Sequence, residues 1–187
     1  MAESYYEIDW ATLPTPEDDG AADHLMQREL PGFALPSTAG APVELAALPG
    51  LTILYIYPKT GQPGTPMPDG WDMIPGARGC TPQSCSFRDH WEDLKTLGVD
   101  HLFGLSSQDT AYQAEARDRM HLPFEILSDA DFGFANALEL PTFEAGGERL
   151  FKRMSLGIEG GRIVHVAYPV FPPDRNPEIV MDWLSSR

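Results

Sequence analysis

The sequence predicts an α/β protein in which helices flank a central mixed β-sheet. Segments typical of strands and helices alternate from residue 51 to residue 138, as they do when parallel strands are joined by helices. Two more strand candidates follow, and the turn between them, Glu159-Gly160-Gly161, is typical of a β-hairpin. Alternation followed by a hairpin favours a sheet with both parallel and antiparallel pairs.

The first elements of the chain include the strand expected at the centre of the sheet. Residues 51–57 are β-branched or aromatic at most positions, which is typical of a strand buried on both faces. Before it, residues 30–36 and 42–45 mix apolar and turn residues and predict a short hairpin. Residues 21–28 are predicted to form a short helix.

The later elements follow from apolar spacing and turn residues. Pro82 favours a helix start with Thr81 as its cap. Phe87, Trp91 and Leu94 then recur on one face of a helix that extends to about residue 97. The remaining candidates are strands at 101–106, 124–127, 150–158 and 162–168 and helices at 110–121, 131–138 and 177–184.

Composition and charge indicate one compact domain and exclude two classes of partner. With 187 residues, 42% of them hydrophobic, the chain is long enough to bury a core. We expect an N-terminal extension over residues 1–28 and a single domain over residues 29–187. The net charge of −15 argues against nucleic acid and anionic membranes, since both would repel the protein. We find no secretory signal and no apolar run of the roughly 20 residues that span a bilayer, so a cytoplasmic location is expected.

The segment from residue 58 to residue 79 predicts a long loop. Its prolines and glycines are Pro58, Gly61, Pro63, Gly64, Pro66, Pro68, Gly70, Pro75, Gly76 and Gly79. A loop of this length in a compact domain is uncommon and often functional, for example as a lid, and a surface insertion without a role is the alternative. Trp71 within it is interpreted as a packing residue, or else as a wall of a substrate pocket.

The cysteines are the residues from which a reaction can be argued. Cys80 and Cys85 are the only cysteines of the chain, with four residues between them, beside the predicted helix start. The positive end of a helix stabilises a thiolate, so Cys80 is a candidate nucleophile. Cys85 is either a second redox thiol or an inert buried one. The pair supplies only two of the four ligands of a typical zinc site and the five histidines are scattered, so no metal and no cofactor are expected.

Several segments together resemble one enzyme family. They are Pro31-Gly32-Phe33-Ala34-Leu35-Pro36, Leu54-Tyr55-Ile56-Tyr57-Pro58-Lys59, Gly79-Cys80-Thr81-Pro82-Gln83-Ser84-Cys85-Ser86-Phe87-Arg88-Asp89, Leu127-Ser128-Asp129 and Arg153-Met154-Ser155. From about residue 30 to residue 184 the chain resembles the peroxiredoxins of the Q type, the bacterioferritin comigratory group. The resemblance implies a thioredoxin-like fold and a thiol-dependent peroxidase that reduces hydrogen peroxide or organic hydroperoxides.

The resemblance also implies a role for each candidate residue. Cys80 would attack the peroxide and become a sulfenic acid, and Cys85 would form an intramolecular disulfide with it. A thioredoxin-like or other dithiol reductant would restore the thiols, in a monomer or a homodimer. Arg153 matches the family's arginine that binds the peroxide and stabilises the thiolate. Its place in an apolar predicted strand, in a chain with only 13 lysines and arginines, favours that role over a surface ion pair.

One family feature is missing upstream of the first cysteine. The family has threonine or serine three residues before that cysteine and proline seven before it, whereas this chain has Ala77 and no proline at those positions. We attribute the difference to an insertion at about residues 59–76. Either Thr81 or Arg78 then replaces the missing hydroxyl, with Pro75 as a shifted shield, or the peroxidase activity is weak.

The spacing of the cysteines predicts local unfolding if they form a disulfide. Five positions apart on a regular helix, the two Cα atoms are roughly 8.7 Å apart, more than the ~7 Å that a disulfide tolerates. The first turn must therefore unwind before Cys85 reaches Cys80.

Two other functions remain open from the sequence. One is a general thiol–disulfide oxidoreductase, although the Cys-x-x-Cys spacing typical of that activity is absent. The other is a non-enzymatic redox sensor that uses the same disulfide to change the inserted loop.

Overall fold

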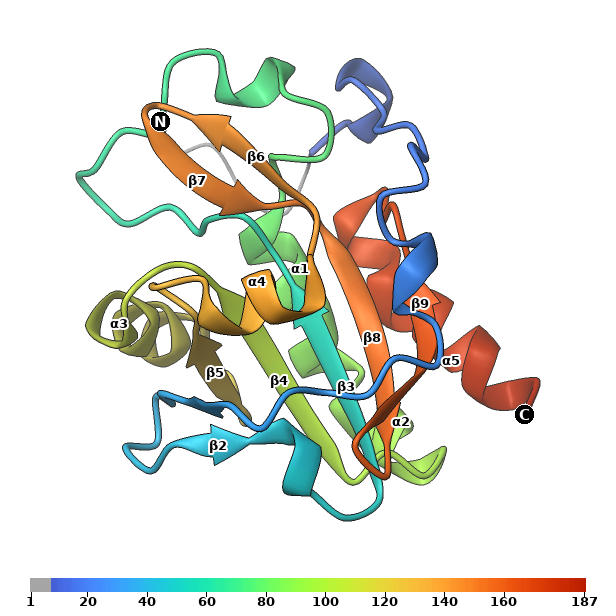
Figure 1. Ribbon diagram of the computed structural model, residues 1–187. Helices are drawn as coiled ribbons and strands as arrows, with labels where there is room; N and C mark the ends of the chain where they lie inside the picture. The colour runs from blue at the N-terminus through green and yellow to red at the C-terminus, as the bar shows by residue number, and fades with distance from the viewer. Residues whose placement is uncertain (1–7) are drawn as a thin grey trace.

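A mixed five-stranded sheet forms the centre of the molecule (Figure 1), as the sequence predicted. The computed structural model describes residues 8–187. The strand order is β5-β4-β3-β8-β9; β3, β4 and β5 are parallel, and β8 and β9 are antiparallel to their neighbours. The strands are β3 (Leu51–Ile56), β4 (His101–Ser106), β5 (Glu125–Ser128), β8 (Met154–Glu159) and β9 (Arg162–Ala167). The predicted hairpin after residue 30 is confirmed as β1 (Ala34–Leu35) with β2 (Val43–Glu44).

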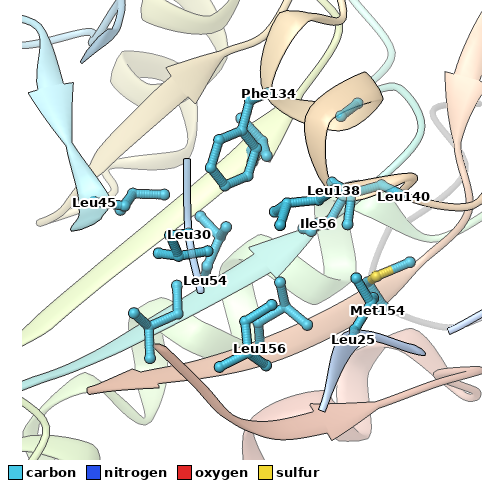
Figure 2. Packing of buried hydrophobic residues seen from close by; sticks show 14 of the residues in the cluster. Leu25, Leu30, Leu45, Leu54, Ile56, Phe134, Leu138, Leu140, Met154 and Leu156 are labelled. Carbon is cyan, nitrogen blue, oxygen red and sulfur yellow. The ribbon is translucent and has the colours of Figure 1, made fainter. Parts of the chain in front are cut away.

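Side chains of the central strand alternate between two hydrophobic cores, because successive residues of a strand point to opposite faces. All six residues of β3 are buried. Leu54 and Ile56 lie in one core with Phe134 and Leu25, which Figure 2 shows between the sheet, α4 and the N-terminal segment. Tyr55 and its neighbours lie in the other core, beneath the helices on the opposite face. The site described below lies near the carboxyl end of β3, on the side of this second core, which includes both cysteines.

Within residues 8–187 five α-helices pack around the sheet (Figure 1), and none of them is long and apolar enough to cross a bilayer. They are α1 (Cys80–Asp89), α2 (Trp91–Thr96), α3 (Thr110–Met120), α4 (Gly133–Leu138) and α5 (Asn176–Ser185). Local caps account for two of the predicted starts. The Asp109 carboxylate accepts a hydrogen bond from the backbone N–H of Tyr112 in α3, and the Asp129 carboxylate accepts from Phe134 and Ala135 in α4.

The predicted single helix from residue 82 to residue 97 is wrong in two respects. It begins at Cys80, because Gly79 adopts a φ of +109° and turns the chain into the helix earlier. Pro82 is accommodated as its third residue, since the first four N–H groups of a helix have no intrahelical partner. The helix also breaks at His90, where the backbone N–H and the ring Nδ1 both contact the carbonyl of Ser86, at 3.0 and 2.9 Å.

The predicted helix at residues 21–28 is also wrong. Only Asp23–Leu25 forms a short 3-10 turn, η2. Gln27, with a φ of +67°, then turns the chain, and residues 27–30 form backbone hydrogen bonds with the edge strand β9. Pairing with that edge therefore overrides the local helical preference.

The predicted strand at 150–158 is interrupted at Arg153. Residues 148–151 form β7 (Glu148–Phe151), which pairs with β6 (Thr142–Ala145), a strand that we did not predict. Arg153 therefore lies in a two-residue link between β7 and β8, not within a strand. The β6–β7 hairpin packs against the long loop, where η4 (Trp71–Met73) places Trp71 against Ala145 and Leu150.

Candidate active site

The first turn of α1 presents Cys80 at the edge of a cavity. Its side chain is buried, at 3% exposure, and its Sγ lies 3.7 Å from the carbonyl oxygen of Ala77. The carbonyl of Gly79 accepts the backbone hydrogen bond of Gln83, at 3.0 Å, so the helix is regular from its first turn. Cys80 is thus the first helical residue, nearer the positive end of the helix than a start at Pro82 would have placed it.

Arg153 contacts the sulfur directly. Its Nη2 lies 3.2 Å from Cys80 Sγ, and the arginine is as buried as the cysteine, at 3% exposure. Within residues 8–187 none of the ion pairs includes Arg153. A buried cation without a carboxylate partner beside a thiol stabilises a thiolate as its counterion. The structure thus brings together two residues that are 73 positions apart in the sequence.

The remaining donors of Arg153 hold its guanidinium in place. Nε donates to the carbonyl of Gly76 at 3.2 Å, and Nη2 also lies 3.0 Å from the carbonyl of Ala77 and 3.3 Å from that of Arg78. Nη1 donates to Gln83 Oε1. Because Arg153 lies in the link between β7 and β8, its guanidinium reaches three carbonyls of the loop that leads to Cys80.

A buried polar chain extends from Arg153 to the C-terminal helix, and the sequence did not indicate it. Gln83 Nε2 donates to Asn176 Oδ1 at 2.8 Å, and Asn176 Nδ2 donates to Ser155 Oγ at 2.9 Å. All three side chains of this chain are fully buried. No local signal marks Asn176, since a polar residue before Pro177 is typical of any helix start.

Cys85 lies on the same regular helix as Cys80, so the predicted separation of roughly 8.7 Å between their Cα atoms applies to this structure. Cys85 is 3% exposed and belongs to the core that contains Tyr55 and Phe87, whose rings stack at 4.5 Å. Both cysteines are reduced. A disulfide between them therefore requires α1 to unwind.

The long loop forms most of the wall of the cavity next to Cys80. The cavity has a volume of about 520 Å³, and its lining includes Trp71, Arg78 and Thr81. The interpretation of Trp71 as a packing residue is confirmed, since its side chain is buried against Ala145 and Leu150, and the same residue also lines the cavity. Pro75 is exposed and does not line the cavity, so the expectation that it shields the thiol is wrong.

The two residues that could replace the family's missing hydroxyl, Arg78 and Thr81, differ in their surroundings. Arg78 Nη1 forms an ion pair with Asp72 Oδ2 at 2.7 Å, so its guanidinium already has an anionic partner. Thr81 lines the cavity directly beside Cys80. Ala77 offers only a methyl group, and its carbonyl is bound by Arg153.

The tyrosines beneath the site remain neutral. Burial raises the pKa of the Tyr55 and Tyr57 hydroxyls well above the ordinary tyrosine value. Tyr55 donates to Ser84 Oγ at 3.1 Å and so ties the sheet to α1. In the part of the chain that the structure describes, no three His, Cys, Asp or Glu side chains lie close enough together to hold a metal ion.

Comparisons with known proteins identify the family and agree with the fold. The sequence matches the family model described as Redoxin over residues 26–181. It is 30% identical over 164 residues to Peroxiredoxin Bcp of Escherichia coli strain K12, an alignment that covers 82% of this chain and 91% of that protein. The fold is similar to that of Peroxidoxin BcpB from Mycobacterium tuberculosis, with a TM-score of 0.68 and 21% sequence identity; the superposition covers 86% of this chain and 96% of that chain. It is also similar to that of Peroxiredoxin Q from Xanthomonas campestris (TM-score 0.67, 19% identity, 88% of this chain and 98% of that chain).

Proposed function

The chain belongs to the redoxin family as a thiol-dependent peroxidase of the Bcp and Q type, and we propose that Cys80, Cys85 and Arg153 carry its reaction. The observation that carries the assignment is the 3.2 Å contact between Arg153 Nη2 and Cys80 Sγ at the start of α1. The substrate class is hydrogen peroxide or organic hydroperoxides, which reach the thiol through the adjoining cavity.

The first step is attack on the peroxide bond. The Cys80 thiolate attacks one peroxide oxygen, the S–O bond forms and the O–O bond breaks, and the leaving oxygen takes a proton and departs as water or an alcohol. Cys80 is left as a sulfenic acid. Arg153 supports this step with a cationic donor that stabilises the thiolate before attack and the negative charge that develops on oxygen during it.

The second step forms the disulfide. The first turn of α1 unwinds, the Cys85 thiolate attacks the sulfur of the Cys80 sulfenic acid, and water leaves as the S–S bond forms. A dithiol reductant, which we propose to be thioredoxin-like, then returns both cysteines to thiols by exchange and is itself oxidised to a disulfide.

Thr81 is the residue that we propose in place of the missing hydroxyl. The guanidinium of Arg78 is engaged by Asp72, whereas Thr81 lies in the cavity wall next to the sulfur. A Thr81→Val variant should reduce peroxide more slowly while its Cys80 is alkylated at the wild-type rate. Unchanged peroxide reduction would remove Thr81 from the site.

The function is tested by peroxide consumption with dithiothreitol as the reductant. Cys80→Ser should abolish turnover, because only a thiolate at this position can attack the O–O bond. A Cys80→Ser protein that consumes peroxide as fast as the wild type would overturn the assignment. A wild-type protein that is oxidised once without turnover would instead indicate a redox sensor, and circular dichroism of both proteins controls for folding.

A further inference from the structure

The N-terminal strap, which we define as residues 8–25, lies outside the segment that matches the redoxin family, yet it touches the site at several points. Ile8 lines the cavity beside Cys80. Leu25, at the other end of the strap, is fully buried in the core. The strap, blue in Figure 1, is therefore anchored in the core at one end and lines the cavity beside Cys80 at the other.

Trp10 encloses the start of α1 together with η5 (Pro173–Arg175). A Cβ atom built on Gly79 would lie 2.8 Å from Trp10 Cη2 and 2.7 Å from Pro173 Cγ, so both side chains press on the backbone directly before the nucleophile. The indole Nε1 donates to Asp174 Oδ2 at 3.0 Å. The carbonyl of Asp174 in turn accepts a hydrogen bond from Ser86 Oγ at 2.6 Å. Trp10 and η5 thus clamp the segment of α1 that contains both cysteines.

A second contact anchors the middle of the strap next to Arg153. The Asp19 carboxylate lies 2.5 Å from Lys152 Nζ and accepts a hydrogen bond from the Tyr168 hydroxyl at 2.7 Å. These partners hold the pKa of Asp19 well below its ordinary value. Pro16 also packs near Gly76, whose carbonyl binds Arg153. The strap is therefore positioned to keep Trp10 on the helix start.

We propose that the strap is a latch on α1, and that Trp10 is a positioning residue that sets the rate of disulfide formation. This inference rests on the proposed function of the two cysteines. Unwinding of the first turn breaks the hydrogen bond from the Gln83 N–H to the Gly79 carbonyl, and we expect it to displace Gly79 from Trp10 and Pro173. Each contact that holds the clamp closed should then slow the second chemical step. Attack on peroxide takes place with the helix folded and does not require the clamp to open.

The latch has a consequence for the fate of the sulfenic acid. While the helix stays folded, a second peroxide molecule can oxidise the Cys80 sulfenic acid to a sulfinic acid, with the peroxide reduced to water or an alcohol. A tight latch prolongs that exposure, and a loosened latch shortens it. The strap therefore controls how much peroxide the protein tolerates before it is inactivated.

The experiment separates the two steps in the 187-residue protein. Reduced protein is mixed with hydrogen peroxide, quenched with acid and an alkylating agent at set times, and analysed by mass spectrometry for sulfenic acid, disulfide and sulfinic acid at Cys80. Trp10→Phe keeps a ring but removes the donor to Asp174, and disulfide formation should become roughly fivefold faster, the factor of one ordinary hydrogen bond. Trp10→Ala also removes the ring, and the acceleration should be roughly 20-fold or more. Both variants should form less sulfinic acid.

Trp183→Phe is the matched control, since it makes the same exchange on α5, where the indole stacks on His165 at 4.3 Å. It should leave both steps unchanged. Disulfide formation at the wild-type rate in Trp10→Ala would overturn the latch, and so would an equal change in the attack and disulfide steps, which would give Trp10 a general role in site integrity.

A separate measurement distinguishes failure of the latch from failure of the proposed function. Amide hydrogen exchange of residues 80–86 in the reduced protein requires no peroxide chemistry, and Trp10→Phe should accelerate it. If the wild type consumes no peroxide, the proposed function fails, but faster exchange in the variant still supports the clamp. Unchanged exchange overturns the clamp whatever the peroxidase assay shows.

Discussion

Removal of the guanidinium of Arg153 should slow peroxide attack by two to three orders of magnitude. In Arg153→Met the sulfur loses the donor that lies 3.2 Å away, and the developing oxyanion loses its cationic partner. Removal of one such donor from an enzyme site typically costs about 3 kcal/mol in the transition state, which corresponds to a factor of roughly 100 to 1,000. Arg153→Lys keeps the charge but cannot reproduce the fork of donors, so its defect should be intermediate.

The same substitution should also destabilise the fold. It removes the arginine donor from the carbonyls of Gly76, Ala77 and Arg78 and from Oε1 of Gln83, and leaves the Ala77 carbonyl only the weak contact with Cys80 Sγ. A buried acceptor without a partner costs about 1–3 kcal/mol, and water from the adjoining cavity can reach part of this set. We therefore expect the free energy of unfolding to fall by roughly 3 kcal/mol, measured by urea denaturation.

The assay must separate a chemical defect from unfolding. Stopped-flow peroxide reduction is measured at a temperature where circular dichroism shows the variant to be folded, and alkylation of Cys80 is followed from pH 5 to pH 9. Arg187→Met is the matched control, because its guanidinium pairs with Glu159 at the surface. If folded Arg153→Met reduces peroxide within threefold of the wild type and its alkylation is unchanged at every pH, Arg153 has no part in the reaction.

Three further predictions address resolution, helix opening and pH. Without reductant, Cys85→Ser should trap Cys80 as a sulfenic acid and permit one turnover without a disulfide, which mass spectrometry after one equivalent of peroxide detects; a variant that accumulates no more sulfenic acid than the wild type would contradict a resolving role. Oxidation to the disulfide should speed amide exchange at residues 76–90 and leave β3 unchanged, since the disulfide cannot form on intact helix; equal exchange in both states would remove the unwinding step. Burial lowers the pKa of His165, so below pH about 6.5 the unfolded chain takes up a proton more readily than the folded one. The free energy of unfolding should therefore decrease as the pH is lowered. His165→Phe should flatten that loss between pH 7 and pH 5 in urea denaturation, and parallel curves would exclude His165 as its source.

The sheet was predictable because its strands carry their own signal. The β-branched and aromatic residues of β3, and the apolar run of β4 at residues 101–106, fit buried strands without reference to the rest of the chain. The cysteine pair and its helix were found for the same reason, since proline, glycine and cysteine spacing is local information. The contact between Arg153 and Cys80 was expected from the family resemblance and not from the local sequence.

The elements that were missed depend on partners distant in the chain. Strand β6 is stabilised by pairing with β7 and by the packing of the hairpin on Trp71 of the long loop. The break at Arg153 occurs because loop carbonyls bind its guanidinium, and no property of residues 150–158 alone records it. Asn176 joins the site only because α5 packs against α1, which tertiary structure decides.

Gly79 places a restriction on how this arrangement can vary among related sequences. Its φ of +109° is rarely adopted by residues with a Cβ atom, and that atom would collide with Trp10 on one side and Pro173 on the other. We therefore expect relatives that have a tryptophan over this backbone to have glycine before the nucleophile. A relative without that tryptophan would lack one of the two side-chain clashes, while the positive φ and the proline would still favour glycine. Joint inspection of these positions across homologues would show whether the tryptophan and the glycine occur together.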